Sequence, residues 1–512
     1  MINTCLSVKG NAGTVVSREE LVKEVVESMK TENVRWVMVQ FLDVPGRLQQ
    51  MTFPAREILD DPENAFNVAV GGFDGSSIKG FTMINESDML LRPVPETFAI
   101  IPDDWQSPPG VAAGRTARFL AQIFWGGYKK GEAKRFEKDP RYIAERAEEY
   151  LAEQGYKAYF GPEVEFMILN KVINEVDRPW KKMHVEVVSA EAAWNTELPI
   201  IRFEEGYVPA IPYDKMFWIR QEIATVLEDH FGIQVEAHHH EVASPGQGEI
   251  DFRFDTLTRA ADKVVTLKFV VKNVAAKYGL VATFMPKPVY ADNGNGMHTH
   301  QSLWSKDKDE NLFYDPNDEY AELSQLARYY IGGILKHARA LSAIVNPTTS
   351  SYKRLVPGYE APIYIAWSKA NRSAIIRVPN YMRGVPKAAR IEYRSPDPST
   401  NPYLAFAAMV AAGLDGIKKK IEPPPPVDQN IYAMDPKTRR ELEEVVRKQL
   451  GTPLQLPRTL CEAIEELEND HDWLFPIFTK EMLETWIEMK KEECLKIESY
   501  PHPAEFYQYF DI

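Results

Sequence analysis

The stretch that most constrains the fold runs from residue 238 to residue 254 and reads HHHEVASPGQGEIDFRF. Pro245 fixes its own φ and the nearby glycines tolerate positive φ, so the stretch predicts two antiparallel strands around a turn. Strands paired about Pro245 would place Glu241 directly opposite Glu249, with both side chains on one face. Two carboxylates held that close repel each other unless a cation lies between them. The hairpin therefore predicts either a metal site or two solvated glutamates on an exposed surface.

The overall charge and the cysteines restrict the classes of partner. The chain of 512 residues carries a net charge of −14, which argues against a nucleic-acid or anionic-membrane partner. Cys5, Cys461 and Cys494 are odd in number and far apart, so we expect neither a disulfide framework nor a thiolate metal site. The sequence contains no signal-peptide pattern and no apolar run of the ~20 residues that span a bilayer. We therefore expect a cytoplasmic protein.

The pattern of elements predicts two domains after a short leader. We expect residues 1–16 to be a loose leader, residues 17–135 a small mixed α/β unit, and residues 136–512 a larger unit. Residues 171–211 show no clear periodicity and are expected to be irregular. The sequence EPPPPV at 422–427 predicts a stiff linker before a helical tail.

Metal-ligating side chains recur at strand spacing outside the hairpin. Glu163 and Glu165 stand two residues apart, and so do His298 and His300, so each pair points to one face of its strand. Glu392 lies between two arginines in a further strand-like segment. With the hairpin, these segments supply glutamates and histidines without a thiol, a set that favours Mg²⁺ or Mn²⁺ over Zn²⁺ and suffices for two ions. Because four segments repeat the pattern, we prefer the metal site to exposed glutamates.

A second cluster is cationic and lies in a region rich in Gly, Pro and Ser. It consists of Arg354, Arg372, Arg377, Lys387, Arg390 and Arg394. Arginine binds phosphate and carboxylate groups in a bidentate manner, so the cluster predicts a polyanion or a carboxylate substrate, with surface salt bridges as the alternative for part of it. Divalent metals together with arginines are what phosphoryl transfer requires. The sequence contains neither a P-loop motif nor the protein-kinase motifs.

Ten motifs between residues 73 and 417 carry a resemblance to a known family. They are FDGSSIKGF (73–81), NESDM (85–89), GPEVEF (161–166), HHHEVASPGQGEI (238–250), ATFMPKP (282–288), DNGNGMHTHQSLW (292–304), NPTTSSYKRLVPGYEAP (346–362), NRSAIIRVP (371–379), RIEYRSPDPSTNPYLAFAA (390–408) and AGLDGI (412–417). With these motifs the chain resembles the glutamine synthetases of the bacterial and archaeal type I class. The resemblance implies an α+β fold with an N-terminal β-grasp-like domain and a larger C-terminal α+β catalytic domain of the glutamine synthetase/guanido kinase type. It also implies a homo-oligomer, a dodecamer of two hexameric rings with active sites between subunits.

The resemblance implies a role for each residue of the two clusters. One metal ion would bind Glu165, Glu241 and Glu249, and the other would bind Glu163, His298 and Glu392. Glutamate would contact Asn293, Gly294, Arg354, Glu360, Arg372 and Arg394. ATP would contact Glu236, Phe254, His300, Ser302, Arg372, Arg377, Lys387 and Arg390. The catalytic residues would be Asp74, Glu360 and Arg372, with Glu360 on a closing flap and Asp74 reaching the neighbouring subunit's site to bind and deprotonate ammonium.

The implied reaction joins ammonium to glutamate through γ-glutamyl phosphate, with ATP as a substrate and Mg²⁺ or Mn²⁺ at two or three sites. One alternative is a γ-glutamyl ligase that uses another amine, such as a polyamine. The presence of Asp74, Asp88 and Glu360 favours ammonium instead. A second alternative is a non-catalytic assembly or sensor protein, against which all six metal ligands are present.

Two positions bear on regulation. Tyr432 lies in a loose match to a motif that some members of the family adenylylate, and we expect an unmodified surface residue there. Met83 stands where another subgroup has an arginine used in feedback inhibition, so we do not expect that mechanism in this chain.

Overall fold

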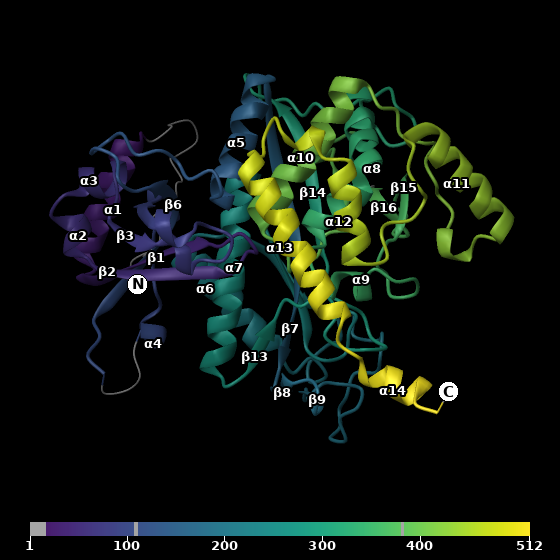
Figure 1. The fold of residues 1–512 in the computed structure, drawn as a ribbon, viewed down its shortest axis with the longest axis horizontal. Coiled ribbons are helices and arrows are strands. Elements are labelled where there is room, and N and C mark those ends of the chain that lie inside the picture. The colour runs from purple at the N-terminus through teal and green to yellow at the C-terminus, as the bar shows by residue number, and fades with distance from the viewer. Residues whose placement is uncertain (1–16, 107–110, 380–382, 512) are drawn as a thin grey trace.

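The computed structural model describes residues 17–106, 111–379 and 383–511, so the predicted leader at 1–16 lies outside the described residues. The chain forms two parts that lie side by side, each built on its own sheet (Figure 1). The smaller part, coloured purple to blue, contains the first strands, and the larger part contains most of the helices. Strands and helices are thus both present in each part, as the α+β prediction expects.

The N-terminal part is a six-stranded mixed sheet with strand order β2-β1-β6-β4-β3, in which β5 pairs with β6. β1 and β6 run parallel, whereas the other pairs are antiparallel. The strands are β1 (Val34–Leu42), β2 (Leu48–Pro54), β3 (Gly71–Asp74), β4 (Asp88–Pro93), β5 (Ala99–Ile100) and β6 (Arg115–Trp125). The helices are α1 (Arg18–Thr31), α2 (Arg56–Leu59), α3 (Pro62–Asn67) and α4 (Asp103–Gln106).

The C-terminal part is organised around a nine-stranded sheet whose main order is β10-β11-β7-β14-β17-β16-β15, with β12 and β13 also paired to β7. The strands are β7 (Tyr156–Leu169), β10 (Val235–His240), β11 (Gln247–Phe252), β12 (Asp255–Thr256), β13 (Val281–Thr283), β14 (Met297–Ser305), β15 (Tyr364–Lys369), β16 (Ala374–Val378) and β17 (Ile391–Tyr393). The helices are α5 (Pro140–Glu153), α6 (Phe217–Phe231), α7 (Leu257–Lys277), α8 (Gln325–Val345), α9 (Ser351–Arg354), α10 (Pro402–Lys419), α11 (Pro436–Leu450), α12 (Leu460–Asn469), α13 (Lys480–Glu498) and α14 (Pro503–Tyr509). No helix in the described part of the chain is long and apolar enough to cross a membrane.

Helices α8 and α10 pack tightly against each other and support the centre of this sheet. A methyl group added at Gly333 would lie 2.1 Å from the carbonyl oxygen of Ala412, so the close approach of the two helices requires a glycine there. Both helices are buried along most of their length. Phe406 of α10 stacks on Phe160 of β7 with ring centroids 4.9 Å apart. The pair therefore gives β7 and β14 a rigid apolar backing.

A buried polar network joins the two parts of the chain. Arg118 of β6 is 1% exposed and donates hydrogen bonds to Gln40 of β1 and to Thr266 of α7. The amide of Asn401, at the start of α10, donates to the backbone carbonyls of Asp43 and Val44 at 3.2 Å. Because a buried arginine without partners is costly, these contacts favour one fixed arrangement of the two sheets.

One prediction about an irregular segment is wrong in part. Residues 171–211 are not irregular throughout, because β8 (Lys171–Arg178) and β9 (Lys182–Val188) form an antiparallel hairpin. Exposed side chains on both faces hid its alternation. Residues 422–427, predicted as a stiff linker, form neither helix nor strand and pack on the sheet at β15, where the indole of Trp367 donates to the carbonyl of Pro424 at 2.6 Å.

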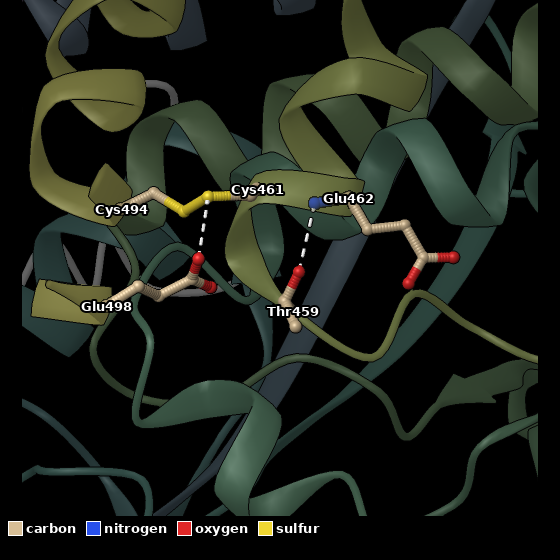
Figure 2. The surroundings of a disulfide bond; sticks show 5 residues. All are labelled: Thr459, Cys461, Glu462, Cys494 and Glu498. Carbon is tan, nitrogen blue, oxygen red and sulfur yellow. Dashed lines mark hydrogen bonds between the residues drawn. A yellow bond between two sulfur atoms is a disulfide. The ribbon is translucent and has the colours of Figure 1, made fainter. Parts of the chain in front are cut away.

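The prediction that the chain lacks disulfides is also wrong. Cys461 of α12 and Cys494 of α13 are bonded, with Cα atoms 5.7 Å apart and a sequence separation of 33 residues. Figure 2 shows the bond joining the two helices, with Glu498 beside the sulfur of Cys461 at 3.4 Å. Helix packing brings the two cysteines together, and their sequence spacing carries no sign of it. The disulfide ties α13 to the body of the C-terminal part.

One buried histidine bridges three helices of the same region. His337 of α8 has both ring nitrogens bonded to carboxylates, Nδ1 to Asp470 at 2.7 Å and Nε2 to Asp415 at 2.9 Å. Its ring stacks on Trp473 with centroids 4.8 Å apart. Burial alone would lower the pKa of His337, but the two carboxylates outweigh burial and raise the pKa above 6.5. The imidazolium thus links α8, α10 and the end of α12.

We predict that His337→Gln lowers the thermal midpoint more at pH 6 than at pH 9. A raised folded-state pKa means that the stabilisation by the imidazolium is fully present below 6.5 and is lost as pH rises through the folded pKa. Thermal unfolding of both proteins across this range measures the difference. His184→Gln, which changes an exposed histidine of β9, is the control. A difference that stays constant with pH would contradict a charged His337.

Candidate active site

Cross-strand pairing at the centre of the larger sheet collects the predicted metal ligands. β14 runs antiparallel to β7 with His298 opposite Glu163, and it pairs with β17 so that His300 lies opposite Glu392. On the other side of β7, Glu165 lies opposite Glu249 of β11. Since side chains alternate between faces of a strand, these pairings bring acids and histidines from four strands to one face of the sheet.

The hairpin forms as predicted, but its register differs by two residues from the expected one. His239 lies opposite Glu249, and Glu241 instead pairs with Gln247, whose carbonyl accepts its backbone N–H at 3.0 Å. The turn is centred on Ser244, which donates two hydrogen bonds of 2.8 Å to the carboxylate of Asp292, one from its backbone N–H and one from its hydroxyl. This anchor decides the centre of the turn. Glu241 and Glu249 still point to the same face, together with His239.

Two groups of three residues could each hold a metal ion. One group is Glu163, His298 and Glu392, and the other is His239, Glu241 and Glu249, and within each group the ligand atoms lie within 4.8 Å of one another. His239 was missed by the sequence reasoning, although its position two residues before Glu241 was the available signal. Glu165, expected in the second group, has one carboxylate oxygen bonded by the backbone N–H of Gly296 at 2.7 Å and by Gln247 at 3.1 Å.

The electrostatics of the second group call for a cation. Burial raises the pKa of Glu249 well above 4.5, and the charges of Glu163, Asp251 and the neighbouring glutamates raise it further. Burial and the charge of Glu241 raise the pKa of Glu165 to about 8. A divalent ion among these carboxylates would remove the repulsion and favour their charged form. The donor set, hard carboxylate oxygens with one imidazole and no thiol, fits Mg²⁺ or Mn²⁺.

The first group is held in the charge state that metal binding requires. Burial opposes the charge of Glu163, but hydrogen bonds from His298 and His300 outweigh burial and hold its pKa well below 4.5. Burial and the charge of Arg394 lower the pKa of His298 to about 4, so its imidazole is neutral. Glu392 is 1% exposed and forms ion pairs with Arg377 and Arg394. Two arginines therefore balance the charge of this group from behind.

A cavity of about 480 Å³ opens beside these carboxylates. Its lining includes all six residues expected to bind glutamate, namely Asn293, Gly294, Arg354, Glu360, Arg372 and Arg394. Arg354 is buried and donates to the carbonyl of Ser395 at 2.8 Å, so its guanidinium is held in place. A methyl group at Gly294 would lie 2.3 Å from the carbonyl of Pro286 and 3.0 Å from Arg354, so only glycine fits this wall. Tyr207 and Tyr359 also line the cavity and were not predicted.

A second cavity of about 490 Å³ lies next to the first. Its lining includes Glu236, Phe254, His300, Ser302, Lys387 and Arg390 of the residues expected to bind ATP. Tyr159, at one wall, contacts Phe254 and Trp304 edge to face, at 5.4 and 5.5 Å between ring centroids. Tyr159 and Trp304 were not predicted, although they flank the metal ligands on β7 and β14. Glu163 and Asp251 line both cavities, so the two spaces meet beside the carboxylate cluster.

Three of the predicted site residues are absent from one or both of these cavities. Arg372 lines the first cavity and not the second, and Arg377 lines neither but is bonded to Glu392. Asp74, at the end of β3, is exposed and belongs to the smaller part of the chain. Its carboxylate accepts hydrogen bonds from the hydroxyls of Ser76 and Ser77, which lower its pKa. It lines neither cavity of its own chain.

Tyr432 differs from the predicted surface residue. Its side chain is half-buried, and its hydroxyl donates to the backbone carbonyl of Ala361 at 2.6 Å. Ala361 directly follows Glu360, whose φ of 56° is unusual for a residue with a side chain. Met83 is 76% exposed.

Comparison with known proteins identifies relatives along almost the whole chain. Residues 33–126 match the family described as "Glutamine synthetase, beta-Grasp domain", and residues 137–509 match "Glutamine synthetase, catalytic domain". The chain is 54% identical to a glutamine synthetase of Sulfolobus acidocaldarius, over 95% of this chain and 98% of that protein. It is 46% identical to one of Aquifex aeolicus, over 96% and 99%. The structure is similar to the Plasmodium falciparum glutamine synthetase solved by cryo-electron microscopy, with a TM-score of 0.83, 28% identity, and coverage of 97% and 99%.

We predict that Glu249→Gln raises the thermal midpoint of the metal-free protein while it weakens the response to metal. The variant removes the cost of protonating Glu249 on folding, and this advantage grows above pH 4.5, where the unfolded glutamate ionises while the folded one keeps its proton. We expect a gain on the order of 2 °C at neutral pH. Added Mg²⁺ or Mn²⁺ should stabilise the original chain more than the variant.

Thermal shift with and without chelator provides both measurements. Glu444→Gln, which changes an exposed residue of α11, should alter neither of them. Equal stabilisation of the Glu249 variant and the original chain by metal would refute the assignment of Glu249 as a ligand.

Proposed function

The chain belongs to the glutamine synthetase family, and from this premise we propose a role for each group of residues in the two cavities. Members of the family are ligases, and the chain joins ammonium to glutamate in an ATP-dependent reaction that yields glutamine, ADP and phosphate. It uses ATP and a divalent metal. The observation that carries the residue assignments is that the two cavities meet at Glu163 and Asp251.

The first cavity is proposed to bind glutamate. Arg354 and Arg394 are buried cations, and with Arg372 they offer the charge that a dicarboxylate needs. Asn293 and Gly294 line the same cavity, where Gly294 packs closely against Pro286 and Arg354. In this pose the γ-carboxylate lies toward the carboxylate cluster, where the two cavities meet.

The second cavity is proposed to bind ATP. The aromatic rings of Phe254, Tyr159 and Trp304 suit a purine base, and the basic side chains of Lys387 and Arg390 suit its phosphates. Arg390 donates from Nε to Nδ1 of His300 at 3.2 Å, which leaves the Nε2–H of His300 to donate to Glu163 at 2.9 Å. Arg377 is proposed to act on this site indirectly, through its ion pair with the metal-ligand candidate Glu392.

Two or three divalent ions are proposed between the cavities. Glu165, Glu241 and Glu249 would hold one, with His239 beside them, and Glu163, His298 and Glu392 would hold another. When bound, such ions shield the phosphates of ATP from the incoming carboxylate. We propose Mg²⁺ or Mn²⁺, since the site offers no thiol.

Within this arrangement the γ-carboxylate oxygen of glutamate attacks the terminal phosphorus of ATP, and ADP leaves. Arg372 is proposed to balance the charge that spreads over the transferring phosphoryl group. Ammonia then attacks the carbonyl carbon of γ-glutamyl phosphate, and phosphate leaves. Glu360 is proposed to close over the cleft and keep water away from the acyl phosphate.

Ammonium is proposed to bind Asp74 from a neighbouring subunit. A carboxylate holds the cation and then accepts its proton beside the acyl phosphate. Asp74 is exposed and lines neither cavity of its own chain, as a residue that serves another chain would. We therefore propose that the chain forms a homo-oligomer. In line with the family resemblance and the sequence, we also propose that it is a dodecamer of two hexameric rings and that it is located in the cytoplasm.

We predict that glutamate and ATP support amide formation with ammonium far better than with other amines. Methylamine, putrescine and spermidine should each show at least about a hundredfold lower kcat/KM, because a site that holds ammonium by charge and hydrogen bonds disfavours bulkier amines. Chromatographic detection of each amide, together with ADP release, makes the comparison. A preference for a polyamine would replace ammonium as the proposed substrate and retain the acyl-phosphate chemistry.

We predict that two inactive variants, Asp74→Ala and Arg372→Ala, regain activity when they are reassembled together. Random mixing gives roughly a quarter of interfaces an intact loop and an intact catalytic side, so up to about that fraction of normal activity should return. The measurement is glutamine formation after joint unfolding and refolding, with each variant refolded separately as the control. Mixed oligomers that remain inactive would show that Asp74 acts within its own chain.

A further inference from the structure

Residues 427–432, which we call the brace, lie between the proline-rich segment and α11 and contact two loops of the glutamate cavity. The brace is held to the body of the protein at its start. The backbone N–H of Val427 donates to the carbonyl of Trp367 at 2.9 Å, and the carboxylate of Asp428 accepts hydrogen bonds from Tyr320 and Ser368. Ile431, near its end, is fully buried. The brace is therefore a fixed support rather than a loose connection.

On one side the brace is bonded to the base of the flap, the loop that carries Glu360. The hydroxyl of Tyr432 donates to the carbonyl of Ala361 at 2.6 Å, and its ring packs on Tyr364 at 5.5 Å between centroids. Burial and the neighbouring Tyr364 raise the pKa of Tyr432 to about 12, so the hydroxyl keeps the proton that it donates. Ala361 is 2% exposed, whereas Glu360, one residue earlier, is exposed over the cavity. The bond to Tyr432 thus marks where the flap leaves the fixed part of the fold.

The backbone of the flap depends on such support. Glu360 has a φ of 56°, a conformation that a residue with a side chain keeps only where its surroundings enforce it. Gly358, two residues earlier, has a φ of 105°, and a Cβ added there would meet no atom within 4 Å. Packing therefore does not restrain the backbone of the flap on that side. The anchor at Ala361 is therefore the contact that orients Glu360.

On the other side the brace holds the turn that carries Arg372. The amide of Asn371 donates to the carbonyls of Val427 and Gln429 at 2.8 and 2.9 Å. The hydroxyl of Ser373 accepts from the backbone N–H of Ile431 at 3.1 Å and donates to Asn371 at 2.8 Å. Both neighbours of Arg372 are thus bonded to the brace, while Arg372 itself is exposed and lines the cavity.

We propose that the brace positions Glu360 and Arg372 relative to each other, through Tyr432 of the brace and through Ser373, which is bonded to the brace at Ile431. The proposal rests on the proposed function, in which Arg372 acts on phosphoryl transfer and Glu360 excludes water. A flap released from Tyr432 would admit water to the acyl phosphate. Water would then attack the carbonyl carbon in place of ammonia, which returns glutamate and releases phosphate, so ATP is consumed without glutamine.

The test compares phosphate released with glutamine formed by Tyr432→Phe, which removes only the hydroxyl. We expect the ratio of phosphate to glutamine to rise above one, the kcat for glutamine to fall about tenfold, and the KM for ATP to stay within about twofold. Tyr278→Phe is the matched control, because it removes a hydroxyl that donates to Glu222, away from both the brace and the flap. The control should keep the ratio at one, whatever its stability.

A second variant tests the other side of the brace and does not depend on the first. Ser373→Ala removes both bonds of that hydroxyl and should lower kcat about tenfold through Arg372, with the ratio of phosphate to glutamine near one. A ratio and a kcat that stay normal in Tyr432→Phe would refute the brace, as would the same rise in ratio in Tyr278→Phe. Failure of the original chain to form glutamine would instead refute the proposed function.

Discussion

The pairing of β7 with β11 on one side and β14 on the other is the constraint on which the rest of the site depends. It sets Glu165 against Glu249 and Glu163 against His298. Without a bound cation this arrangement opposes folding, because burial and mutual repulsion raise the pKa of several of these carboxyls. This arrangement therefore favours a bound cation. In the metal-free protein, the close carboxylates lower the stability of the fold.

The rest of the larger part serves to hold that cluster in place. α8 and α10 approach closely through Gly333 and form an apolar layer behind β7 and β14. Arg377 of the neighbouring strand β16 and Arg394, which directly follows β17, balance the charge of Glu392. Buried ion pairs of this kind add little net stability, but they fix the direction of the side chains. Rigid backing and fixed charges together allow the carboxylates to stay close in the absence of substrate.

The exposed residues assigned to the cleft are held in place differently from the buried carboxylates. Glu360, Arg372 and Asp74 are all exposed; Glu360 and Arg372 lie on loops or turns, and Asp74 lies at the end of β3. Each is nevertheless tied by a neighbour: Glu360 through Ala361 and Tyr432, Arg372 through Asn371 and Ser373, and Asp74 through Ser76 and Ser77. The buried contacts of Arg118 and Asn401 then join the smaller part, which carries Asp74, to the larger part.

The sequence by itself determined the chemical character of the site. The spacing of Glu163 and Glu165, the absence of thiols near them, and the run of arginines from Arg354 to Arg394 predict metal-assisted chemistry on an anionic substrate, because alternation along a strand is a local property. The strand β7 and the helices α5, α7 and α10 could also be predicted, because their sequence patterns are local as well. Only the tertiary structure decided the register that sets His239 opposite Glu249, the bond between Cys461 and Cys494, and the contact of Tyr432 with the flap. Those features depend on how distant segments pack, and the spacing of residues along the chain carries no information about that.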